Sequence, residues 1–204
     1  MQIAKTFLSA VMLILLATRV IADDQGRAIY ESQCMACHGN PGLELKTPLL
    51  HGQESTYLIR SLEAFQLGSR IDQIMSSMNG IAAGLSNEEI VAVSQYLGGQ
   101  DACEIDIDID FAKDGFREAF SAGRTKYSES NCAHCHESFH HYAPRIMGQK
   151  ADYLRLSLSQ FKSGVRAAPM MRRILESWTE EDFENVVTYL SGMRLMRACG
   201  EGQS

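Results

Sequence analysis

Two short runs of this chain place a pair of cysteines and a histidine at the same spacing. They read Cys34-Met-Ala-Cys37-His38 and Cys132-Ala-His-Cys135-His136. Two thiols three positions apart can add to the two vinyl groups of one haem, and the adjacent histidine then lies where it can bind the iron. A zinc site or a redox dithiol also uses paired cysteines, but neither explains a histidine directly after both pairs. The two runs therefore predict two covalently bound haem c groups.

A methionine sulfur is the expected second ligand of each haem iron. Methionine in this position is common in c-type electron carriers and raises the reduction potential. Met78 and Met171 each lie seven residues before the residue that precedes a predicted helix start, so we predict that they are the ligands. Met75 and Met170 are the alternatives, and a second histidine ligand in either half is a further one.

The second half of the chain repeats the first at an offset of 96 residues. Residues 48–58 read Pro-Leu-Leu-His-Gly-Gln-Glu-Ser-Thr-Tyr-Leu, and residues 144–154 read Pro-Arg-Ile-Met-Gly-Gln-Lys-Ala-Asp-Tyr-Leu. Each copy goes on to Phe-x-x-Gly-x-Arg and holds one cysteine–histidine run. Because internal repeats indicate repeated structural units, we predict two haem domains, over 23–100 and 116–204, with an acidic linker over 101–115.

Only helices are predicted within the two halves. Ser86-Asn-Glu-Glu89 has the capping-box form, Thr179-Glu-Glu-Asp182 is a looser version of it, and apolar residues at helical spacing follow both. Further helices are expected just before each haem motif and in the middle of each half, over residues 25–33, 116–130, 55–67 and 151–161. The fold class is therefore all-α, with two tandem domains that are each built around one covalently bound haem.

The N-terminus has the form of a secretory signal peptide. Lys5 precedes an apolar stretch over residues 7–18, and small residues end at Ala22, where we predict cleavage. The stretch is shorter than a membrane span, and Arg19 interrupts it, although an uncleaved anchor is the alternative. Residues 1–22 are therefore predicted to direct export to the periplasm.

Two prolines and two arginines recur at positions that suit haem binding. A ligand histidine usually donates its other ring N–H to a carbonyl, and the carbonyls of Pro48 and Pro144 are candidate acceptors for the two histidines. Arg70 and Arg166 are candidate partners of the haem propionates, because a guanidinium matches carboxylate geometry.

Two cysteines remain outside the haem motifs. Cys103 and Cys199 end their repeats, and in an oxidising compartment they are predicted to form a disulfide, which would contribute about 4 kcal/mol in the chain-entropy model. The alternative is two free thiols. The acidic run Glu104–Asp110 superficially resembles a calcium loop, but Phe111 stands where such a loop needs glycine.

The charges are unevenly distributed along the chain. Residues 23–100 carry 4 basic and 9 acidic side chains, a net of −5, whereas residues 111–204 carry 13 and 11, a net of +2. Such a dipole can orient a protein on a redox partner. A nucleic-acid binder would usually show a basic face, so this function is excluded.

These motifs together resemble the cytochrome c4 family. The resemblance rests on two Cys-x-x-Cys-His runs, each followed by Pro-x-x-x-Gly-Gln-x-x-x-Tyr-Leu, Phe-x-x-Gly-x-Arg and Met, with Leu-Ser-Asn-Glu-Glu-Ile in the first half. It covers nearly all of the predicted mature chain. It implies two class I cytochrome c domains, the axial pairs His38/Met78 and His136/Met171, and electron delivery toward a terminal oxidase or reductase.

The chain departs from the family pattern, for example where Trp178-Thr179 replaces Leu-Ser, and two other features carry a second resemblance. Glu-Ser-Phe-His-His follows the second haem motif where a glycine-rich loop is usual, and Cys103 and Cys199 lie outside the pattern. The long linker and the run Arg-Ala-Ala-Pro-Met are similar to the dihaem subunit of flavocytochrome c sulfide dehydrogenase. This resemblance leaves the haem prediction unchanged and bears on the partner.

Three functions are consistent with two haems. The first is an electron carrier between respiratory redox proteins, with no substrate of its own and, as a variant, with association at the membrane surface. The second is an electron-accepting subunit bound to a flavoprotein. The third is a haem peroxidase, which needs a vacant or displaceable ligand, and a methionine at the matching place in both halves argues against it.

Overall fold

The computed structural model describes residues 23–39, 46–73, 76–100, 113–137 and 142–193. Every regular element in these ranges is helical, which confirms the all-α prediction. No helix of this part of the chain is long and apolar enough to cross a membrane. After a helical stretch over 23–29, the elements are η1 (Tyr30–Cys34), α2 (Met35–His38), α3 (Ser55–Gln66), α4 (Ser77–Ala83), α5 (Asn87–Gly99), α6 (Phe116–Glu129), α7 (Ala133–His136), α8 (Ala151–Ser163), α9 (Pro169–Leu175) and α10 (Glu180–Gly192).

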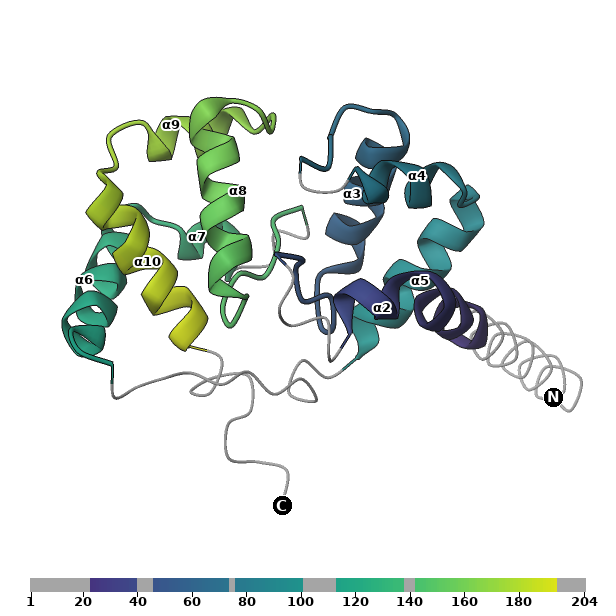
Figure 1. The fold of residues 1–204 in the computed structure, drawn as a ribbon, viewed down its shortest axis with the longest axis horizontal. Helices are drawn as coiled ribbons and strands as arrows, with labels where there is room; N and C mark the ends of the chain where they lie inside the picture. Colours follow the sequence, from purple (N-terminus) through teal and green to yellow (C-terminus); the bar gives the residue numbers. More distant parts are fainter. Residues whose placement is uncertain (1–22, 40–45, 74–75, 101–112, 138–141, 194–204) are drawn as a thin grey trace, which may run out of the picture.

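The two halves share one helical plan. A helix leads into each cysteine–histidine run and is followed by a middle helix (α3 or α8), a short helix (α4 or α9) and a final helix (α5 or α10). Figure 1 shows the halves side by side, with α3 and α8 nearest to each other. Each half has its own apolar core, around Ile90 and Val93 in the first and around Val186 and Val187 in the second. The sequence repeat is therefore a repeat of structure.

The final helix of each half begins with a capping box. In α5, the Ser86 hydroxyl accepts from the Glu89 N–H at 3.2 Å, and the Glu89 carboxylate accepts from the Ser86 N–H at 2.8 Å. In α10, Thr179 and Asp182 make the same pair of bonds at 3.1 and 2.9 Å. These bonds satisfy N–H groups that a helix start leaves unpaired, and they confirm both predicted starts.

Glycines let the first and last helices of each half cross in backbone contact. A Cβ added at Gly123 of α6 would lie 1.9 Å from the carbonyl oxygen of Asn185 in α10, and one added at Gly26 would lie 2.4 Å from that of Ala92 in α5. No larger residue fits these positions. The crossing fixes the direction in which each first helix enters its haem-attachment run.

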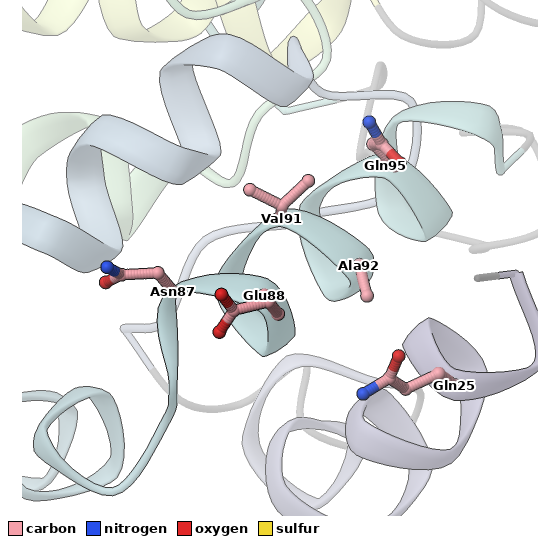
Figure 2. Close-up of a pocket in the computed structure, with 6 residues that line it drawn as sticks. All are labelled: Gln25, Asn87, Glu88, Val91, Ala92 and Gln95. Atoms are coloured by element: carbon pink, nitrogen blue, oxygen red, sulfur yellow. The ribbon is translucent and has the colours of Figure 1, made fainter.

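A shallow groove lies between the helical stretch over 23–29 and α5. Figure 2 shows that the residues lining it come from the N-terminal helical stretch and from α5. Its lining holds no histidine, cysteine or methionine, so the groove has no haem-ligand chemistry. The lining residues are Gln25, Asn87, Glu88, Val91, Ala92 and Gln95.

Because α6 and α10 cross in backbone contact at Gly123, adding one methyl group at this position is predicted to destabilise the protein. We expect Gly123→Ala to lower the free energy of unfolding of the haem-loaded protein by about 2–3 kcal/mol, because the added carbon must push two backbones apart. Gly99→Ala is the matched control, since an added Cβ there meets nothing within 4 Å. Denaturant unfolding followed by circular dichroism measures both variants. Equal midpoints for the two would contradict this account of the crossing.

Candidate haem sites

Each haem-attachment run folds as a single helical turn. Cys34 ends η1 and immediately precedes α2, which holds Cys37 and ends at His38. In the second half, Cys132 immediately precedes α7, whose last residue is His136. Residues three apart on a helix lie on the same side, so both thiols of a run can reach one ligand while the histidine follows directly.

Burial of the first cysteine in each run raises the pKa of its thiol, which disfavours the thiolate that a redox dithiol uses. Burial, together with the neighbouring Cys37, raises the pKa of the Cys34 thiol to about 11. Burial likewise raises the pKa of Cys132 to about 11. A redox dithiol must form a thiolate readily. In addition, no three His, Cys, Asp or Glu side chains of the described residues gather as a metal site.

Both histidines are held by a proline carbonyl. His38 is buried, and its Nδ1 lies 2.9 Å from the Pro48 oxygen; His136 Nδ1 lies 2.7 Å from the Pro144 oxygen. Burial lowers the pKa of both rings, although the carbonyl contact acts in the opposite direction. A neutral ring that donates from Nδ1 keeps its Nε2 lone pair for a metal.

The two methionine candidates of the second half differ sharply in burial. Met170 is 61 % exposed, whereas Met171 is partly buried and packs against the core of its half. In the first half, Met78 is the second residue of α4 and is also partly buried. Met75, Cys103 and Cys199 lie outside the described residues, as do His140 and His141, which follow the second haem motif.

Asn79 ties α4 to the end of α3 and to the loop between them, a role that no pattern in the sequence indicated. Its Nδ2 donates to the carbonyls of Phe65 and Arg70, both at 2.8 Å, and its Oδ1 accepts from the N–H of Asp72 at 2.9 Å. These bonds fix the segment that carries the neighbouring Met78. The corresponding residue of the second half is arginine, so no recurrence pointed to this asparagine.

Two glutamines join the halves by a symmetrical exchange. Gln149 Oε1 accepts from the N–H of Leu49 at 2.8 Å, and its Nε2 donates to the Leu49 carbonyl at 3.1 Å. Gln53 makes the same two bonds to Arg145, at 2.7 and 2.9 Å. Leu49 and Arg145 directly follow the two prolines. The recurrence of Gly-Gln in both halves could have drawn attention to these residues, but it gave no information about their partners.

The two arginines also reach into the opposite half. Arg70 donates to the Tyr153 hydroxyl at 3.2 Å, and Arg166 donates to the Tyr57 hydroxyl at 2.8 Å. Burial acts to raise the pKa of Tyr153, but the two arginines outweigh it and lower that pKa. The cluster thus holds more positive charge than its own hydroxyls balance, which fits the carboxylates of a bound group.

These features fit covalently bound haem. Paired thiols at this spacing suit thioether formation, each histidine is oriented with Nε2 available, and the arginine cluster suits acidic substituents. When bound, haem supplies an iron that accepts and gives up one electron. The two cysteine pairs would supply the attachment, His38 and His136 would each supply one oriented nitrogen ligand, and each half has an apolar core.

The fold and the two sites define a c-type cytochrome with two haem groups. The chain is 31 % identical over 176 residues to cytochrome c-552 of Acidithiobacillus ferridurans, a match that covers 79 % of this chain and 74 % of the relative. The solved structure of Acidithiobacillus ferrooxidans cytochrome c4 superposes with a TM-score of 0.64 at 28 % identity and covers 78 % of this chain and 98 % of that one. The chain therefore belongs to the dihaem cytochrome c4 family.

Two further comparisons support the same function. The family described as cytochrome c oxidase, cbb3-type, subunit III matches residues 22–97, which is the first half. A protein of Stutzerimonas stutzeri named thiosulfate dehydrogenase electron acceptor is 27 % identical over 216 residues and covers 91 % of this chain and 94 % of its own length. The protein binds two covalently attached haem c groups and carries electrons between redox partners.

The role of Asn79 is open to a direct test. Asn79→Ala is expected to lower the free energy of unfolding by about 2–3 kcal/mol, since it leaves partly buried backbone groups without partners. Asn87→Ala, at an exposed position in the groove of Figure 2, is the control and should cost well under 1 kcal/mol. The measurement is denaturant unfolding of the haem-loaded proteins. A loss no larger than that of the control would show that Asn79 does not hold α4.

Proposed function

We propose that His38 with Met78, and His136 with Met171, are the axial ligands of the two haem irons, and that Cys34, Cys37, Cys132 and Cys135 form the thioether bonds. The observation that carries this proposal is the pair of histidine–proline contacts, which leave Nε2 of each ring available for iron. The burial of Met171 beside the exposed Met170 favours the second methionine. Two saturated iron sites suit electron transfer and leave no open position for a peroxide.

We also propose that Arg70 and Arg166 bind propionates of the two haems. Each arginine already bonds to a tyrosine of the opposite half, and both lower the pKa of the same hydroxyl, so the two guanidinium groups act on one region between the halves. Carboxylates placed there would gain charge-assisted hydrogen bonds. The two haems would then approach each other by their propionate edges, which favours electron exchange within the molecule.

In the cell, we propose that the protein is exported by its signal peptide, works in the periplasm and passes electrons toward a terminal oxidase or reductase. The resemblance to cytochrome c4 supports this direction. A second candidate is electron acceptance from a dehydrogenase, either a flavoprotein or an enzyme like the one served by the Stutzerimonas stutzeri relative. Both roles use the same two haems. The first is defined by the protein that accepts the electron, and the second by the protein that delivers it.

The proposed ligands predict which methionine substitutions change the spectrum. An iron(III)–thioether bond gives a weak far-red absorption band, and we expect Met78→Ala and Met171→Ala each to remove about half of its intensity, because each variant loses one of two such bonds. Met170→Ala should leave the band intact, since its side chain is 61 % exposed. Loss of the band in Met170→Ala but not in Met171→Ala would reassign the ligand.

Purification under native conditions tests the proposed role. Oxidised and reduced spectra, with haem quantified against protein, should show two c-type haems per chain that are fully reducible, with no flavin present. Mass analysis should place the mature N-terminus at Asp23. Flavin that stays with the protein through purification would favour the flavoprotein partner, and a co-purifying enzyme that reduces the haems with thiosulfate would favour the second type of dehydrogenase.

A further inference from the structure

The loop that holds each histidine is itself held by the other half of the chain. Pro48 accepts from His38, and the next residue, Leu49, has both its N–H and its C=O bonded to Gln149. Within its own half the loop is anchored by a bond of 2.7 Å from the Thr47 hydroxyl to the Cys37 carbonyl and by one of 2.9 Å from the Gly52 N–H to the Leu97 carbonyl. The carbonyl that orients His38 therefore lies one residue from a two-point contact with the second half.

The second half shows the same arrangement with the roles exchanged. Pro144 accepts from His136, and the backbone of Arg145 is bonded at both groups to Gln53 of the first half. The anchor within this half is the bond of 2.8 Å from the Gly148 N–H to the Leu190 carbonyl. Figure 1 shows that the loops before α3 and α8 lie between the two halves.

The two glutamines can hold the proline carbonyls of the opposite half in a fixed direction. Gln53 and Gln149 are 7 % and 6 % exposed, so their amides are bonded away from water, where a broken bond leaves an unpaired polar group. The peptide bond between a proline and the residue after it is planar and rigid, so fixing the N–H of Leu49 also fixes the plane of the Pro48 carbonyl. The direction of that carbonyl sets the strength of its bond to His38.

We propose that Gln149 is a positioning residue for His38 and that Gln53 is a positioning residue for His136, so that each half sets the reduction potential of the haem in the other half. A firm bond from Nδ1–H to a carbonyl makes the imidazole a stronger electron donor and favours the oxidised iron. Loosening the bond lowers that donation and raises the potential. The inference rests on the proposed ligation by the two histidines.

Crossed substitutions test the proposal. Gln149→Met and Gln53→Met keep the side-chain volume and remove both hydrogen bonds to the opposite loop. We expect Gln149→Met to raise the midpoint potential of the haem attached at Cys34 and Cys37 and to leave the other haem unchanged, and Gln53→Met to give the reverse. Potentials are measured by spectroelectrochemistry of the haem-loaded protein, and each haem is followed by its own resolved methyl resonances in NMR spectra.

Arg145→Ala is the matched control at the same interface. The Arg145 side chain bonds to Glu54 and to the Gly52 carbonyl across the halves, but its removal leaves the backbone bonds to Gln53 in place. We expect this variant to shift neither potential. An equal shift in Arg145→Ala and Gln53→Met would mean that any weakening of the interface acts on the haems, and it would overturn the specific role of the glutamines.

A second pair of variants and one further measurement test the same proposal independently. If a methionine variant fails to fold, Gln149→Asn and Gln53→Asn keep the amide but shorten its reach, and the same crossed shifts are expected. The exchange rate of the histidine Nδ1 proton should rise only in the half opposite the substitution. Shifts in the same half as the substitution, or no shift with intact structure, would overturn the proposal. Failure of the proposed ligation would differ from both outcomes, because substitution of His38 or His136 would then leave the absorption spectrum of the haem in that half unchanged.

Discussion

The other contacts of this structure restrain one interaction, the hydrogen bond between a histidine imidazole and a proline carbonyl. A histidine can bind iron with only one nitrogen, so the other nitrogen must have a defined partner that fixes the tautomer and the ring plane. Here the partner is a backbone carbonyl in both halves, at 2.9 Å for His38 and 2.7 Å for His136. Helix crossing, loop anchors and the contact between the halves all restrain the two segments that this bond joins.

The two halves resemble each other near the histidines and differ near the methionines. On the histidine side, both loops use proline, a glycine with positive φ (68° at Gly52 and 75° at Gly148) and glutamine. On the methionine side, Asn79 ties α4 to the preceding loop, whereas α9 begins at Pro169 and the side chain of Arg172 covers Gly164. The polar surroundings of the two methionines therefore differ, so with Met78 and Met171 as the proposed ligands the two haem potentials are expected to be unequal.

The features that depend on residues close together in the sequence could be predicted from it. The attachment runs and both capping boxes could be read from neighbouring residues, and the partner of His38 was found because proline recurs at a similar distance in both halves. The roles of Gln149 and Asn79 could not be read in this way. The partner of Gln149 lies 100 residues away along the chain. The partners of Asn79 are backbone groups at the end of α3 and in the irregular loop after it, which no periodic pattern relates to Asn79. Arg70 was expected to bind a propionate, and the structure adds a tyrosine of the opposite half as its partner.

The exchange of glutamines follows from the duplication itself. When two copies of one segment meet around an approximate two-fold axis, each contact occurs twice with the partners exchanged, as in a symmetric dimer. A loop that offers both a free backbone edge and a glutamine can therefore bind its own copy without any other change. The glycine before the glutamine is required because an L side chain rarely adopts its positive φ. A duplicated chain with this turn thus brings each histidine loop into contact with the glutamine of the opposite half, which is the contact that the proposed control of the haem potentials requires.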